Sequence, residues 1–437
     1  MKKSRKILAI TAASALVFGM GACSGNPGTG SSSAGGDSKA PVEITYLHRL
    51  PDGEGMVKVD DIVARWNKEH PEIQVKATKF DGNAQQMIQR LETDVNANNG
   101  PCLGQLGYNE VPEFYSKGLV LDVTTEANKY KDKFSGAFGQ MSTGGKISGL
   151  PQDTGPLVYF YNETEFKNLG ITVPKTLDEF KTAAAKAAVA GKYIADFTPD
   201  EVAFWLSAQT AAAGGVWYGT SGDQWKVQVD SPASQKVATF WQDMIDAKSV
   251  LTLDRWGDAY GKALTDGQLI GNIAAAWEFA FLLDPLNDTP AEGQWRVAQI
   301  PDFGAGAKTG PDGGSGVAVM KGCEHPVEAM QFNAWFNTQV DDLTTQGLVV
   351  AALGNPKTPA KALKQFGGQE IMKELATANK NLSMDFAYIP GFSAVGPKAV
   401  ETAAEAAKGT AKVADVFTTA QQASIDALKA AGLSVAQ

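Results

Sequence analysis

The order of strand and helix signals from residue 42 onward constrains the fold more than any other feature. Residues 42–47 form a β-type run, and apolar residues then recur at helical spacing between Met56 and Trp66. Residues 73–77 alternate apolar with polar side chains, as in a strand, and residues 87–95 carry a second apolar helical stripe. This order of elements places helices on the faces of a mainly parallel sheet, so we expect an α/β fold.

The length of 437 residues predicts more than one such unit, because single hydrophobic cores stop growing well below this size. A second unit begins near Pro151, and residues 157–161 are strongly β-type. Thr176 and Glu179 form a capping box for a helix, and the glycine-rich segment 302–315 is the clearest internal break. We expect two lobes, each a mainly parallel sheet flanked by helices.

The N-terminus has the composition of an export signal. Residues 2–6 include four basic side chains and no acidic one, and residues 7–22 form an apolar run, which is shorter than the roughly 20 residues that a membrane-spanning helix needs. The run ends at Cys23, and residues 24–40 are mostly Gly and Ser, typical of a flexible tether. Residues 20–23 resemble the lipobox of bacterial lipoproteins, in which the cysteine becomes lipidated. A plain secretion signal with an incidental Cys23 is the alternative.

Export leads to an oxidising compartment, where the two remaining cysteines can pair. Cys102 and Cys323 each lie beside an apolar strand-like segment, residues 103–106 and 316–320 respectively. A bridge between neighbouring strands is one interpretation, and two buried free thiols are the other.

The composition and the motifs argue against several function classes. A net charge of −9 opposes contacts with phosphates, so nucleic acid is not an expected partner. The three histidines lie far apart in the sequence, and we expect no metal and no cofactor. The chain lacks a Gly-x-Ser-x-Gly elbow, and residues 304–309 depart from both the phosphate-loop and the dinucleotide patterns. These observations favour a binding protein over an enzyme.

Aromatic and hydrogen-bonding residues stand out in loops that follow strands, where ligands of open α/β sheets bind. An indole in a glycine-rich turn or just after a strand also has less chance of core burial than one on a helical stripe. A flat aromatic face beside carboxylates and amides suits a sugar, and unpaired polar groups there penalise the wrong stereoisomer. The candidate ligand-binding residues on these grounds are His48, Tyr108, Asn109, Asp153, Trp217, Trp277 and Glu278.

A set of short segments, in this order and at this spacing, resembles a known family. These segments are residues 62–67 before 71–75, residues 149–156 leading into 161–162, and residues 173–180, 274–278 and 313–319 before 325–326. Together they resemble the extracytoplasmic solute-binding proteins of ATP-driven carbohydrate importers, of the type that includes maltose-binding protein. The resemblance covers essentially the whole chain that follows the signal and the tether.

The resemblance implies two α/β lobes, joined by crossing hinge strands, that close over one sugar. The expected organisation is a signal peptide at 1–22, a lipidated cysteine and tether at 23–40, a first lobe at 41–155 plus 312–365, and a second lobe at 156–311 plus 366–437. The pocket positions of the family correspond here to Tyr108, Asn109, Asp153, Trp217, Trp277, Asp385 and Phe392. Cys102 is a departure, since many members have Asp at the corresponding place.

The resemblance also implies ligand, partners and location. We expect a monomer, anchored by lipid on the extracellular face of the cell membrane, that delivers short oligosaccharides to the permease subunits of an ABC importer. The pattern looks closest to actinobacterial binders of raffinose-type and other 1,6-linked galactosides and glucosides. The alternative is a secreted glycoside-acting enzyme, which would use two carboxylates at a fixed distance, with Asp153, Glu278 and Asp385 as candidates.

Overall fold

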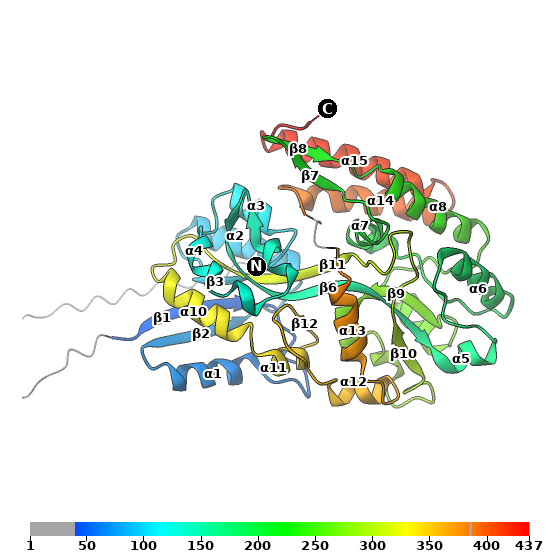
Figure 1. Ribbon diagram of the computed structural model, residues 1–437, viewed down its shortest axis with the longest axis horizontal. Coiled ribbons are helices and arrows are strands. Elements are labelled where there is room, and N and C mark those ends of the chain that lie inside the picture. The colour runs from blue at the N-terminus through cyan, green and yellow to red at the C-terminus, as the bar shows by residue number, and fades with distance from the viewer. Residues whose placement is uncertain (1–39, 384–386, 437) are drawn as a thin grey trace, which may run out of the picture. The chain divides into compact units, whose positions relative to one another are not determined.

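One long strand, β6 (Gly149–Asn162), runs through the centre of the molecule (Figure 1). The computed structural model describes residues 40–383 and 387–436. The first half of β6 pairs with β11 (Pro311–Val319) and β12 (Val349–Val350), and the second half pairs with β9 (Gly271–Ala275) and β10 (Trp295–Ala298). Nearly every residue of β6 is buried, because elements cover both of its faces. β6 therefore joins two groups of strands into one sheet.

The first group of strands follows the β-α-β order expected from the sequence. β1 (Val42–His48) pairs in parallel with β2 (Ile73–Lys79) and β3 (Leu103–Gly107), and β11 pairs with β3 in antiparallel orientation. The elements around this group are α1 (Val59–Glu69), α2 (Ala84–Asn96), α3 (Val111–Ser116), α4 (Thr124–Asn128), η1 (Lys131–Lys133), η2 (Gly136–Met141), β4 (Ser142–Thr143), β5 (Lys146–Ile147), α10 (Pro326–Phe336) and α11 (Val340–Thr345).

The second group, around β9 and β10, is more helical. Its α-helices are α5 (Glu163–Asn168), α6 (Leu177–Val189), α7 (Val202–Ala212), α8 (Pro232–Asp246), α9 (Asp258–Thr265), α12 (Ala360–Gln365), α13 (Ile371–Lys380), α14 (Val395–Ala407) and α15 (Val413–Ala430). Its smaller elements are η3 (Pro199–Glu201), the hairpin β7 (Tyr218–Ser221) and β8 (Gln224–Val227), η4 (Ala276–Ala280), η5 (Asp284–Leu286) and η6 (Phe392–Ala394). α7 is buried on nearly all sides and packs against α8, α14 and β11, which explains its apolar sequence.

Side-chain caps start several helices where the sequence suggests. The side chain of Thr176 accepts a hydrogen bond from the Glu179 N–H at 3.2 Å before α6, although the Glu179 carboxylate accepts from the N–H of Lys175 rather than closing a capping box. Ser231 caps α8 in the same way through the Ser234 N–H. In the described part of the chain, none of the helices has the length and apolar character needed to span a membrane.

The two-lobed α/β fold is confirmed, with differences in detail. Parallel pairing dominates only among β1, β2 and β3. Strands β9, β10, β11 and β12 all pair with β6 in antiparallel orientation, because in each of them the chain runs back along β6. Parallel contacts near β9 are single bridges, such as Tyr193 with Leu269. The expected loop 302–315 is shorter, since β11 begins at Pro311. The lobe boundaries stay a prediction.

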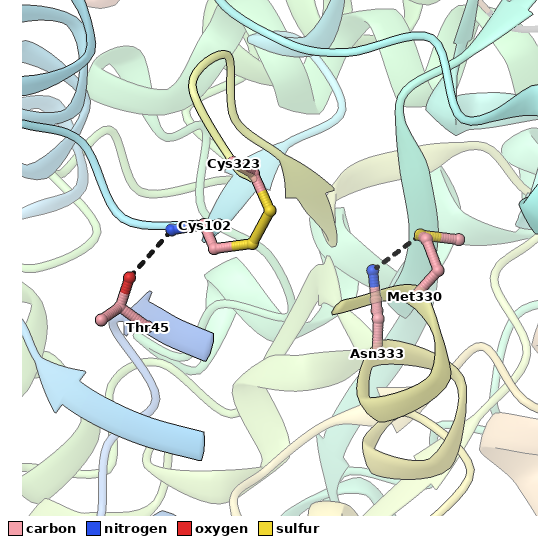
Figure 2. The surroundings of a disulfide bond; sticks show 5 residues. All are labelled: Thr45, Cys102, Cys323, Met330 and Asn333. Carbon is pink, nitrogen blue, oxygen red and sulfur yellow. Dashed lines mark hydrogen bonds between the residues drawn. A yellow bond between two sulfur atoms is a disulfide. The ribbon is translucent and has the colours of Figure 1, made fainter. Parts of the chain in front are cut away.

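Cys102 and Cys323 form a disulfide in the structure, with Cα atoms 4.5 Å apart (Figure 2). Cys102 immediately precedes β3, and its N–H donates to the Thr45 hydroxyl of β1 at 3.0 Å. Cys323 follows β11, and the bond joins positions 221 residues apart. The disulfide thus fastens the beginning of β3 to the end of β11.

Candidate functional site

Strands β6 and β11 form the floor of the candidate site. Asp153 on β6 lies opposite Ser315 on β11, and its Oδ1 accepts hydrogen bonds from the Ser315 N–H at 2.8 Å and from the Ser315 hydroxyl at 2.5 Å. Burial raises the pKa of Asp153 to about 6. The pairing is irregular on both sides of this contact, between Pro311 and Gly314 and between Ser315 and Gly316. Such bulges re-aim side chains and are common beside functional sites.

The segment after β3 adds Tyr108 to this floor. The Tyr108 hydroxyl donates to the Asp153 carbonyl at 2.7 Å, and the Tyr108 N–H donates to the Gly314 carbonyl at 3.2 Å. Gly314 has a φ of 104°, and a Cβ there would lie 2.7 Å from the Tyr108 ring, so only glycine fits this position. The ring of Tyr108 is therefore fixed against both crossing strands, while Asn109 beside it is half-buried.

A cavity of about 250 Å³ lies next to Tyr108. Its walls come from residues on both sides of the β6–β11 pair: the segment after β3, η2 and β4 on one side, the β7–β8 hairpin and residues 387–388 on the other. Aromatic rings are combined with amide and hydroxyl groups, and the side chains of this kind are Tyr108, Tyr218, Trp225, Tyr388, Gln140, Ser142, Thr143 and Thr220. Flat apolar faces beside hydrogen-bonding groups suit a small polyhydroxylated ligand.

Arg255 is the centre of a buried charge cluster next to β11. Its guanidinium forms ion pairs with Glu278, with Glu201 at 3.0 Å and with Asp312 at 3.6 Å. The side chains of Arg255, Glu278 and Asp312 are almost completely buried. Burial raises the pKa of Glu278 to about 7 and that of Asp312 to about 6. The ion pairs join η3, η4 and β11 through Arg255. Removing any one partner would leave a buried charge uncompensated, so the cluster holds these three elements together.

Trp277 lies where this cluster meets the crossing strands. Its indole N–H donates to the Asp312 carbonyl at 2.8 Å, and the guanidinium carbon of Arg255 lies 5.6 Å from its ring centroid. A Cβ at Gly155 of β6 would lie 3.2 Å from the indole, so glycine allows this close approach. The ring is half-buried and leaves part of its surface open.

Residues 52–339, more than half of the chain, match the family described as bacterial extracellular solute-binding protein. The chain belongs to this family. Among solved structures, it resembles the galacto-N-biose-/lacto-N-biose I-binding protein of an ABC transporter from Bifidobacterium longum, in complex with lacto-N-biose. The two are 53% identical with a TM-score of 0.86, over 92% of this chain and 100% of that chain.

Two more distant relatives of this solute-binding protein come from Bacillus subtilis (strain 168). An arabinooligosaccharide-binding protein is 24% identical over 286 residues, which span 63% of this chain and 65% of that protein. The maltodextrin-binding protein MdxE is 25% identical over 340 residues, 74% of each chain. Each of the three relatives is named for binding a sugar.

The structure brings three of the predicted residues of this solute-binding protein to the β6–β11 pair. Tyr108 and Asp153 are hydrogen-bonded to each other, and Trp277 is bonded to Asp312 further along β11. Their contact with a ligand stays a prediction. Asp385 and the lipidation candidate Cys23 lie outside the described residues.

Three predicted residues have core positions instead. His48 is 1% exposed, its Nδ1 accepts from the Leu50 N–H, and burial lowers its pKa to about 4. Trp217, also 1% exposed, donates to the Thr210 hydroxyl at 3.3 Å and packs edge-on against Phe417. Phe392 is enclosed by aromatic rings, namely Phe204, Tyr218 and Tyr388. Trp217 is in contact with α7 and α15, Phe392 packs on α7 next to α14 and α15, and His48 packs beside Tyr46 on β1.

Glu278 also differs from its predicted role. It is fully buried, and its Oε1 accepts from the Arg255 guanidinium and from the Ala275 N–H. The carboxylate therefore holds Arg255 rather than facing an open site. Among the described residues, no group of three or more His, Cys, Asp or Glu side chains is arranged to hold a metal ion.

Sequence reasoning missed several residues that matter here. Tyr218 lines the cavity and Trp217 does not, although both rings are 1% exposed and the Tyr218 hydroxyl shares a hydrogen bond with Ser424 of α15 at 2.8 Å. Trp225 lies on the paired strand β8, opposite Thr220. Arg255 has no local signal, because its partners come from three separate segments.

Proposed function

We propose that this chain is the sugar-capturing component of an ABC importer and binds a short oligosaccharide in the cavity beside Tyr108. The observation that carries the proposal is the lining of that cavity, where four aromatic rings are combined with amide and hydroxyl groups from both sides of the crossing strands. The names of the three sugar-binding relatives support it. A sugar ring would pack on the half-buried indole of Trp225, and its hydroxyls would exchange hydrogen bonds with the polar groups of the lining.

The proposed ligand is a disaccharide of the galacto-N-biose or lacto-N-biose type. The 53% identity to the protein from B. longum favours this class over more distant sugars. Raffinose-type and other 1,6-linked galactosides and glucosides, which the sequence pattern suggests, are the second class to compare.

Capture would proceed by closure of the two sides of the cavity on the ligand. The two walls are carried on opposite sides of β6 and β11, so bending of these strands would open or close the space between them. A ligand that contacts both walls binds the closed arrangement better and shifts the population toward it. The closed form would then present the sugar to the permease subunits.

Calorimetry with the purified chain tests the proposal. The panel contains lacto-N-biose I, galacto-N-biose, raffinose, a β-1,6-galactobiose and maltotriose, with galactose and glucose as single units. Saturable binding of one class, with the sugar recovered intact by mass spectrometry, is the expected result. Cleaved product would identify a glycoside-acting enzyme instead, and absence of binding across the panel would contradict the proposal.

The lipid anchor is a separate part of the proposal. Cys23 would carry the lipid, and the Gly- and Ser-rich residues 24–40 would act as the tether. A Cys23→Ser variant should move from the membrane fraction to the medium, and the mass of the wild-type N-terminal peptide should include acyl chains. Retention of the variant in the membrane fraction, or an unmodified Cys23 peptide, would argue against lipidation.

A further inference from the structure

Trp256 is an exposed indole beside the candidate site that none of the roles above explains. It is 51% exposed and lies between Arg255 and α9. It is the one aromatic ring among the exposed large apolar side chains of the described residues, and together with the half-buried Phe281 and Trp277 it forms a contiguous aromatic surface, which indicates a binding surface.

The Trp256 ring is held in place on several sides. Its N–H donates to the Glu201 carboxylate at 3.3 Å, and the ring centroid of Phe281 lies 5.3 Å away. The guanidinium carbon of Arg255 lies 5.3 Å from the indole centroid. Because Arg255 is itself buried and paired with three carboxylates, the exposed ring rests on a rigid base. An aromatic ring fixed in advance loses little conformational entropy when a ligand packs on it.

Trp256 is also continuous with Trp277. Arg255 contacts both indoles, at 5.3 Å and 5.6 Å from their centroids, and Phe281 lies 5.3 Å from Trp256 and 5.7 Å from Trp277. Trp277 is bonded to β11 and Phe281 contacts both indoles, so the three aromatic rings form a row in the order Trp277, Phe281, Trp256. Phe279 and Ala280, next to this row on η4, line a cavity of about 140 Å³ together with residues 54–56 of the β1–α1 segment.

We propose that Trp256, with Phe281, is a second sugar-stacking platform that takes one further pyranose unit of a ligand that extends along β11 from the cavity beside Tyr108 past Trp277. The inference rests on the proposed function and adds the residues that select ligand length. The apolar face of a neutral pyranose ring matches the open indole, and no charge on the ligand is required. A wild-type chain that prefers longer ligands would owe that preference to this row.

The test uses one saccharide series of increasing length, chosen as the class that the wild-type chain binds in calorimetry. The variants are Trp256→Ala and Trp256→Phe, with Trp335→Ala as the control, since Trp335 lies on α10 and packs against Trp66. Trp256→Ala should weaken binding of the longer saccharides about tenfold and leave the shortest bound saccharide within about twofold. Trp256→Phe should retain part of the higher affinity for the longer saccharides, and the control Trp335→Ala should retain all of it. Acrylamide quenching of tryptophan fluorescence should decrease more when the longer saccharide saturates the wild-type chain than when it saturates the Trp256→Phe variant.

The other outcomes overturn the inference in separate ways. Unchanged affinity of both Trp256 variants for every length, or a wild-type affinity that does not rise with length, leaves the proposed function standing and removes the second platform. An equal loss at every length shows that Trp256 acts through Arg255 on Trp277. Normal affinity with defective uptake by cells shows a contact with the permease instead. No saccharide binding by the wild-type chain removes the proposed function and this inference together.

Discussion

The indole N–H of Trp277 donates to the main-chain carbonyl of Asp312 at 2.8 Å. This bond connects η4 directly to the crossing strand β11, two residues before the glycine that packs on Tyr108. The Asp312 side chain is paired with Arg255, so Trp277 contacts the main chain of Asp312 and Arg255 contacts its side chain. Any bending of β11 must therefore move Trp277 or break this bond, which couples Trp277 to the crossing strand β11.

Replacement of Trp277 should weaken sugar binding more than it weakens the fold. Trp277→Ala removes a half-open aromatic face, and we expect a loss of about 1–3 kcal/mol in binding free energy. Trp277→Phe keeps a flat ring but loses the bond to Asp312, and should give an intermediate dissociation constant. Calorimetry measures both, with Trp335→Ala as the indole control. A lowered melting temperature with wild-type affinity would show that Trp277 is a core residue.

Trp217 should behave in the opposite way. Trp217→Ala leaves a cavity beside Phe417 and removes the hydrogen bond to the Thr210 hydroxyl, at a cost of about 3–5 kcal/mol in the free energy of unfolding. The affinity of the folded fraction for sugar should change less than in Trp277→Ala. Denaturant unfolding gives the first quantity and calorimetry the second. If Trp217→Ala retains full stability and loses affinity, the core placement is wrong.

The buried carboxyls around Arg255 should make stability depend on pH. The folded-state pKa values of Glu278, about 7, and Asp312, about 6, lie above the unfolded values near 4. The folded chain therefore binds protons more tightly, and this contribution to stability is largest below about pH 4 and is lost as pH rises through 6 to 7. Glu278→Gln should make the melting temperature less dependent on pH between pH 5 and pH 8. It removes a contribution on the order of 1 kcal/mol to the change in unfolding free energy over this range.

The control for this pH dependence is Glu401→Gln, which changes an exposed carboxylate on α14. Its melting temperature should follow the wild-type curve over the same range. An unchanged slope in Glu278→Gln would show that the cluster does not titrate in this window.

The sequence anticipated the features that depend on local pattern and order along the chain. The first strands and helices follow from periodicity, and Tyr108 and Asp153 follow from their places after a strand and at a lobe junction. The positions that the sequence did not predict depend on tertiary contacts. Trp217 and Tyr218 lie in the same glycine-rich turn, and both rings are 1% exposed because Trp217 packs against Phe417 and Tyr218 is hydrogen-bonded to Ser424, both on α15. Arg255 gathers partners from η3, η4 and β11, which no local window relates.

Removing the disulfide should lower stability without changing the site. The Cys102–Cys323 bond closes a loop of 221 residues in the unfolded chain, and its loss should cost about 2–4 kcal/mol. The double variant Cys102→Ser/Cys323→Ser should melt at a lower temperature than the wild type, and reductant should lower the wild-type value toward that of the variant. Sugar affinity should be retained, because the bond lies at the beginning of β3 and the end of β11, while Tyr108 follows the other end of β3. Equal melting temperatures of variant and oxidised wild type, or two titratable thiols in the unreduced wild-type chain with Cys23 blocked, would contradict the bond.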